Sequence, residues 1–129
     1  LVSLTAAVGA SALPARADAL IYQPGLVSER LAAGETVFLD FKASWCTTCR
    51  AQGRQITALQ AENPAYAEGI TFIAVDWDDW KDAEIVQRLN VPRRSTLIVL
   101  RGDQELGRII ANPRRDDIKA LMDLGLTSS

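Results

Sequence analysis

The sequence contains no histidine, one methionine and only two cysteines among its 129 residues. The absence of imidazole excludes histidine-based acid–base catalysis, nearly all haem ligation and most zinc or copper sites. The single methionine also argues against copper delivery. No long run of Lys or Arg is present and the formal net charge is −2, so neither nucleic acid nor an anionic membrane surface is indicated as a partner.

The chain is nevertheless rich enough in apolar residues to fold on its own. Hydrophobic residues make up 48% of the sequence and charged residues 23%. Such a composition supports one domain with a hydrophobic core, and the chain is too short for two domains.

The first 17 residues differ from the rest. Leu1 to Leu13 is apolar and uncharged, and Pro14 and the triplet Ala15-Arg16-Ala17 follow. This pattern resembles the apolar region and cleavage site of a secretory signal peptide, without its basic start, and is too short to span a bilayer comfortably. We expect a partial signal peptide over 1–17 and a domain over 18–129. The signal peptide would place the mature domain in an oxidising exported space, the periplasm. The alternative is an alanine-rich first helix.

Strand-like and helix-like segments alternate along the remaining chain. The strands expected from apolar runs and alternation are 19–23, 37–43, 70–75, 96–100 and 105–110. The expected helices are 24–33, 46–61, 82–89 and 114–124. This order predicts an α/β fold, a mixed sheet with a parallel centre and an antiparallel edge, with helices on both faces.

Both cysteines lie in one short segment directly after an expected strand, Trp45-Cys46-Thr47-Thr48-Cys49-Arg50. Two thiols at this spacing can close a small reversible disulfide. Cys46 would begin a helix, where unpaired N–H groups and the helix dipole favour a thiolate. We predict that Cys46 is the attacking thiolate and that Cys49, one turn later, resolves the mixed disulfide.

Other interpretations of the pair exist. A structural disulfide over so short a loop would remove little entropy from the unfolded chain. Half of a zinc site would lack its second pair of ligands within this chain. The alternative functions are a non-catalytic metal-handling module that uses the two thiolates, across a dimer, and a disulfide oxidant or isomerase.

Asp40 lies six positions before Cys46, inside an apolar strand. On a central strand covered on both faces a carboxylate is costly, so its pKa should rise. Such a group can accept and return the proton of Cys49 during catalysis, and we predict this role. The alternative is an ion pair with Lys42, which shares the same strand face.

These features together resemble the thioredoxin superfamily. The matching residues are the strand with Asp40, the Trp-Cys-x-x-Cys-basic helix start, Asp76-Trp77 and Leu89-Asn90-Val91. Within the superfamily the chain is most similar to the periplasmic C-terminal thioredoxin-like domain of the disulfide-interchange protein DsbD. The resemblance implies a thioredoxin fold with a sheet of roughly four to five strands. It also implies electron transfer by dithiol–disulfide exchange, without a metal or other cofactor.

The same resemblance implies the partners. We expect periplasmic protein disulfides as substrates and a membrane or periplasmic thiol as reductant, acting with a monomer that is not inserted in the membrane. Strong oxidants of the superfamily carry a histidine between the cysteines, whereas this chain has Thr47 and Thr48. The sequence therefore favours a reductant or electron carrier over a DsbA-like oxidant.

One position departs from the family pattern. The family has a cis-proline directly before the Thr-initiated strand that faces the cysteines, and this chain has Ser95 there. Pro92 comes three residues earlier, where it ends the preceding helix. A cis bond before serine would cost roughly 2.5–4 kcal/mol, so we expect a trans bond and a loop of different shape. We hypothesise that Ser95 donates to the Cys46 sulfur and lowers its pKa, or permits metal binding.

Further residues should shape the surface around the dithiol. The residues that we expect to contact substrate or shape the site are Trp45, Thr47, Thr48, Arg94, Ser95 and Thr96. The acidic, aromatic segment 76–82 should cap a helix through Asp78 or Asp79 and pack one Trp on the core. Its alternative role is a partner-docking rim, with Arg93 and Arg94 as a basic counterpart.

Overall fold

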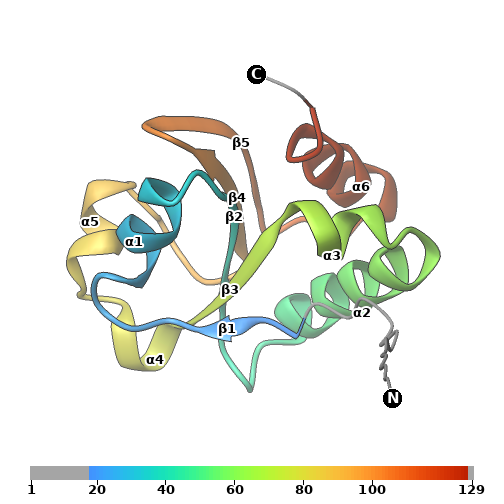
Figure 1. The fold of residues 1–129 in the computed structure, drawn as a ribbon. Helices are drawn as coiled ribbons and strands as arrows, with labels where there is room; N and C mark the ends of the chain where they lie inside the picture. The colour runs from blue at the N-terminus through green and yellow to red at the C-terminus, as the bar shows by residue number, and fades with distance from the viewer. Residues whose placement is uncertain (1–17, 128–129) are drawn as a thin grey trace, which may run out of the picture.

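Helices cover both faces of one mixed sheet in the computed structural model, which describes residues 18–127 (Figure 1). The expectation of a signal peptide over 1–17 lies outside the described residues. The strands are β1 (Leu20–Ile21), β2 (Thr36–Lys42), β3 (Thr71–Asp76), β4 (Thr96–Arg101) and β5 (Gln104–Ile110). The helices are α1 (Leu26–Ala32), α2 (Thr47–Glu62), α3 (Ala65–Gly69), α4 (Trp77–Trp80), α5 (Glu84–Arg88) and α6 (Arg115–Leu124).

The strand order across the sheet is β1-β3-β2-β4-β5. The first three of these run parallel to one another, whereas β4 is antiparallel to both β2 and β5. The prediction of a mixed α/β sheet with an antiparallel hairpin at one edge is therefore confirmed. Because β2 is the central strand, the segment that carries the cysteines leaves the sheet at its middle.

Two hydrophobic cores lie on opposite faces of the sheet, since side chains alternate along each strand. Val37, Leu39 and Phe41 of β2 join a core with α1 and α5. Phe38 joins the other core, with α2, α3 and α6. Figure 1 shows the same division, with α1, α4 and α5 on one side of the sheet and α2, α3 and α6 on the other. Because Asp40 is two residues after Phe38, it faces the core that contains α2, α3 and α6.

Two short helices were not expected from the sequence. The first, α3, begins directly after Asn63-Pro64, just past the end of α2. The second, α4, lies inside the acidic segment, and its cap is Asp76 rather than Asp78 or Asp79. The Asp76 carboxylate accepts from the backbone N–H groups of residues 78 and 79, at 2.9 and 3.3 Å. This leaves the Asp78 side chain free of the capping role.

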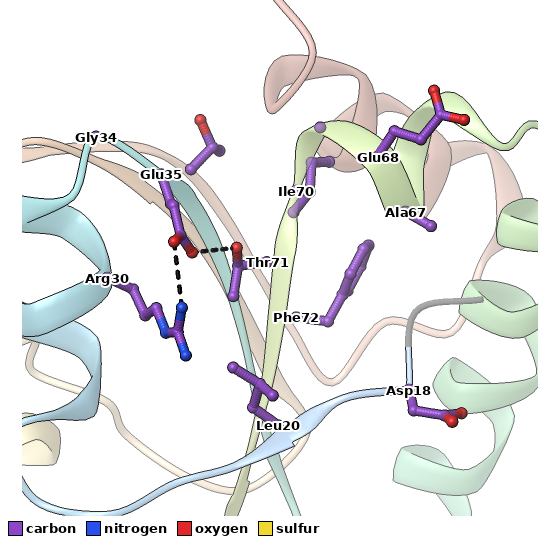
Figure 2. A pocket seen from close by; sticks show the side chains of 12 residues that line it. Asp18, Leu20, Arg30, Gly34, Glu35, Ala67, Glu68, Ile70, Thr71 and Phe72 are labelled. Atoms are coloured by element: carbon purple, nitrogen blue, oxygen red, sulfur yellow. Dashed lines mark hydrogen bonds and ion pairs between the residues drawn. The ribbon is translucent and has the colours of Figure 1, made fainter. Parts of the chain in front are cut away.

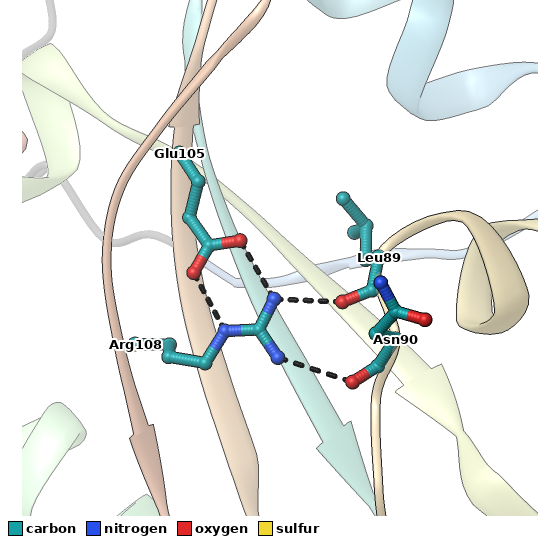
Figure 3. Close-up of polar contacts among 4 residues, drawn as sticks. All are labelled: Leu89, Asn90, Glu105 and Arg108. Atoms are coloured by element: carbon teal, nitrogen blue, oxygen red, sulfur yellow. Dashed lines mark hydrogen bonds and ion pairs between the residues drawn. The ribbon is translucent and has the colours of Figure 1, made fainter.

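A single arginine ties the sheet edge to the segment before the Ser95 loop. Arg108 of β5 forms two hydrogen bonds with the Glu105 carboxylate, each 2.6 Å long (Figure 3). It also donates to the backbone carbonyls of Leu89, at 2.7 Å, and of Asn90, at 3.3 Å. Asn90 has a left-handed backbone with φ 53°. The guanidinium thus satisfies carbonyls where α5 ends and the chain turns toward Ser95.

Candidate active site

The two cysteines form a disulfide at the start of α2, with their Cα atoms 5.2 Å apart. Cys46 is the N-cap residue of this helix and has an extended backbone. Its Sγ accepts a hydrogen bond of 3.1 Å from the backbone N–H of Cys49. Both cysteines are buried, with 3% and 1% of their surfaces exposed. An N–H group already directed at Cys46 Sγ is suited to hold a thiolate after reduction.

Ser95 is the residue that faces the disulfide from the opposite loop. Its Oγ lies 3.1 Å from the Sγ of Cys46 and 3.1 Å from the Sγ of Cys49. The residue is fully buried and has a left-handed backbone with φ 66°. The structure therefore brings Cys46, Cys49 and Ser95 together, and the hydroxyl touches both sulfurs rather than Cys46 alone.

Three hydrogen bonds fix the backbone of Ser95. Its N–H donates to the Phe41 carbonyl at 2.7 Å, and its carbonyl accepts from the N–H of Ala111 at 2.8 Å. The same carbonyl accepts from the Gln52 side chain at 3.0 Å. Gln52 is fully buried on α2, one turn after Cys49, and was not predicted as a site residue. A buried polar residue on the apolar face of α2 is the signal that identifies it.

Trp45 forms an exposed platform beside the cysteines. Its surface is 54% exposed, and its Nε1 donates to the Asp78 carboxylate at 2.8 Å. The Arg94 guanidinium carbon lies 4.3 Å from the centroid of the Trp45 ring. A guanidinium over an indole face is attracted by the π electrons of the ring. The structure thus joins Trp45, Arg94 and Asp78 into one polar and aromatic rim.

The remaining predicted site residues lie at the edges of this arrangement. Thr47 and Thr48 form the first turn of α2, where Thr47 is exposed and Thr48 is partly buried. Thr96 is fully buried, and its Oγ1 donates to the Arg93 carbonyl at 2.7 Å. This bond stabilises the loop that carries Arg94 and Ser95, which makes Thr96 a residue of the loop scaffold.

Asp40 occupies the middle of β2, on the same face as Phe38. Its carboxyl group is buried, and Oδ1 has no hydrogen-bond partner among the described residues. Burial raises the pKa of Asp40 to about 6, and the nearby positive charge of Lys42 opposes this rise. The expected rise is therefore present. Within the described part of the chain, Lys42 and Asp40 do not form an ion pair.

Two neighbouring cavities lie beside Asp40 and Cys49. The first, of about 250 Å³, is lined by Asp40. The second, of about 790 Å³, is lined by Cys49. Both cavities are also lined by Lys42, Gly53 and Thr57. The carboxyl group of Asp40 and the resolving Cys49 therefore each lie beside a cavity bounded by the same residues of β2 and α2.

Comparison with known proteins agrees with this geometry. The family model described as "Thioredoxin" matches residues 26–124. The chain belongs to the thioredoxin family.

Individual relatives agree with the family match. A "Thioredoxin H-type" of Oryza sativa subsp. indica is 32% identical over 87 residues, which cover 67% of this chain and 66% of the relative. "Thioredoxin-2, mitochondrial" of Schizosaccharomyces pombe is 31% identical over 100 residues, or 78% of this chain and 68% of the relative. The solved structure of Trxlp from Edwardsiella tarda EIB202 has a TM-score of 0.68 and 32% identity, covering 82% of this chain and 96% of that one. The protein is thus a thioredoxin-type thiol–disulfide oxidoreductase with a Cys46–Cys49 pair.

A second tryptophan of this thioredoxin packs directly on the dithiol. Trp77, the first residue of α4, is partly buried against a small cluster of Ala43, Cys46 and Cys49. The expectation of one Trp of this segment on the core did not place that Trp at the sulfurs. The sequence does not show which of Trp77 and Trp80 faces the cysteines, because both lie in the same acidic segment.

Another concavity of this thioredoxin, of about 510 Å³, lies at the opposite ends of β2 and β3 (Figure 2). There Glu35 accepts from the Thr71 hydroxyl at 2.6 Å and pairs with Arg30 at 3.3 Å. The Thr71 hydrogen bond lowers the pKa of Glu35. Thr71, Glu35 and Arg30 are joined by hydrogen bonds and no cysteine lines this concavity, so we assign the chemistry of the protein to the dithiol end of the sheet.

Over residues 18–127, no group of three or more His, Cys, Asp or Glu side chains is placed to hold a metal ion. In the same part of this thioredoxin, none of the helices has the length and hydrophobicity needed to cross a bilayer.

Proposed function

We propose that this thioredoxin works in an exported space such as the bacterial periplasm, where it reduces protein disulfides or relays electrons to them. The observation that carries the proposal is the Cys46–Cys49 pair at the start of α2, with the buried Asp40 carboxyl behind it. Cys46 attacks the substrate disulfide as a thiolate, and Cys49 resolves the mixed disulfide. Asp40 takes the proton of Cys49 in that second step.

The partners follow from the same site. A protein disulfide approaches the rim of Trp45, Arg94 and Asp78, which offers an aromatic surface and charges of both signs. A membrane or periplasmic thiol returns electrons to Cys46, as the resemblance to the C-terminal domain of DsbD suggests. The lack of histidine between the cysteines supports a reductant or carrier.

The redox equilibrium of the dithiol in defined thiol buffers tests the activity. Trp77 lies against the cysteines, so its fluorescence should change when the disulfide opens. A potential near −270 mV, about that of thioredoxin, would support a reductant or carrier, whereas about −120 mV would indicate an oxidant. A Cys49→Ser variant, which cannot close the disulfide, is the control. If the protein forms no reversible disulfide and releases metal instead, the proposal is wrong and a metal-handling module takes its place.

The location needs a separate test. The chain is expressed in a bacterial host, and the protein recovered from the periplasmic fraction is analysed by intact-mass spectrometry. Cleavage after Ala17 would leave Asp18 as the first residue, as the triplet Ala15-Arg16-Ala17 predicts. Recovery of the uncut chain only in the cytoplasm would contradict export and leave the redox proposal standing.

A further inference from the structure

The hydroxyl of Ser95 donates toward the disulfide. Its Oγ lies 3.1 Å from each sulfur of the disulfide, inside the protein. Neither sulfur carries a hydrogen while the disulfide is closed, so Ser95 is the donor in both contacts. Among the described residues, these sulfurs are the only hydrogen-bond partners of the hydroxyl. The donor is therefore already directed at the reacting atoms before reduction.

The backbone conformation of Ser95 indicates that its side chain has a functional role. A side chain in the left-handed region costs roughly 1–2 kcal/mol, which glycine would avoid. At Ser95 the three backbone hydrogen bonds to Phe41, Ala111 and Gln52 maintain that conformation. Strain that is held in place next to a reactive group is characteristic of functional positions. Proline would fit neither the φ angle nor the bond from the Ser95 N–H to Phe41, so serine here differs from the family's proline in backbone as well as side chain.

We propose that Ser95 is a catalytic residue whose hydroxyl donates a hydrogen bond to whichever cysteine sulfur carries negative charge. This inference rests on the proposed dithiol–disulfide exchange and adds a third group to it. A hydrogen bond to a charged acceptor is stronger than one to a neutral sulfur, so the reduced protein benefits more than the oxidised one.

Two exchange steps reduce one substrate disulfide. The Cys46 thiolate attacks one sulfur of the substrate disulfide, whose S–S bond breaks, and the other substrate sulfur leaves with the electron pair. Cys49 then gives its proton to Asp40 and attacks Cys46 Sγ as a thiolate, the mixed disulfide breaks, and the second substrate thiolate leaves. The dithiol has lost two electrons, which the substrate has gained. When a donor thiol reopens the disulfide, Cys49 leaves as a thiolate, and Ser95 is already in contact with it.

The test compares Ser95→Ala with Ser95→Gly. Both remove the hydroxyl, but only glycine relieves the left-handed backbone, so the pair separates the side chain from the strain. The rate at which iodoacetamide alkylates Cys46 is followed against pH in the reduced proteins. In both variants the midpoint of this profile should rise by about one pH unit or more, the loss expected for one hydrogen bond to a charge. The redox potential should become more negative in both.

Thr71→Val is the matched control, since it removes a hydroxyl at the other end of the sheet that bonds Glu35. Its alkylation profile should match that of the unmodified protein. An unchanged midpoint in both Ser95 variants, with folding verified by circular dichroism, would overturn the proposal and leave the exchange activity intact. A shift in the alanine variant alone would also overturn it, because backbone strain would then be the cause. Failure of the unmodified protein to cycle would instead refute the proposed function.

Discussion

Replacing Asp40 with asparagine should stabilise the oxidised protein at neutral pH and have a much smaller effect in acid. The carboxyl group is buried, and its Oδ1 has no partner among the described residues. Its pKa is about 6 in the folded protein, against an ordinary value of 3.8. The folded state therefore holds the proton more tightly than the unfolded chain. The stabilisation from Asp40 is fully present below the lower value and is lost as the pH rises through the higher one.

The magnitude follows from the two pKa values. Each pH unit between them corresponds to about 1.4 kcal/mol, so complete ionisation of Asp40 costs the fold about 3 kcal/mol. Between pH 4 and pH 7.5 about 2.5 kcal/mol of this develops, because the unfolded carboxyl is already partly ionised at pH 4. The free energy of unfolding of the variant minus that of the parent should therefore increase by this amount between pH 4 and pH 7.5. Any pH-independent cost of the amide cancels in this increase.

Urea denaturation of the oxidised proteins at pH 4 and pH 7.5 measures this quantity, and the closed disulfide keeps the thiols from titrating. The Asp40→Asn variant should gain about 2.5 kcal/mol relative to the parent as the pH rises. Asp103→Asn, which changes an exposed carboxylate in the turn before β5, should show no such gain. If the free energy of unfolding differed between Asp40→Asn and the parent by the same amount at both pH values, the reasoning would be refuted. The buried carboxyl would then have an ordinary pKa.

Three substitutions away from the dithiol test the scaffold, each by the urea midpoint. Arg108→Ala removes the bonds to Glu105 and to two backbone carbonyls and should lower stability by about 1–2 kcal/mol; a loss too small to measure would contradict the arrangement in Figure 3. Gly53→Ala should raise stability by about 0.5–1 kcal/mol, since nothing lies within 4 Å of the added carbon in α2. Gly125→Ala should lower it by about 1–3 kcal/mol, because the added carbon would lie 2.7 Å from Cδ1 of the buried Ile70. If the two glycine variants behaved alike, the packing around them would differ from that described.

Most of the fold could be predicted from the sequence because its long elements carry clear periodicity. The strand 37–43 and the helix 46–61 were each found to within one residue at either end. The helices α3 and α4 were missed because four or five residues are too few to show a helical repeat. The order of strands across the sheet was not predicted either, since it depends on tertiary packing rather than on local pattern.

Some residues of the site could also be predicted from the sequence, and others could not. Cys46, Cys49 and Asp40 were predicted because a thiol pair and a carboxylate in an apolar strand are chemically unusual wherever they lie. The role of Gln52 was not predicted, because a polar residue on the apolar face of α2 does not show which group it bonds until the fold places the Ser95 carbonyl beside it. The cap at Asp76 was assigned to its neighbours, because several adjacent aspartates offer the same chemistry to a helix start.

The alternation of β2 between two cores has a consequence for how such a chain can change over evolutionary time. Phe38 and Asp40 face α2, whereas Leu39 and Phe41 face α1 and α5. Apolar residues of similar size can replace one another along this strand. The loss or gain of one residue inside it would turn the carboxyl group toward the wrong helices and leave Phe41 or Leu39 in its place. We therefore expect changes in chain length to be tolerated in loops, such as the turn between β4 and β5, and not inside β2.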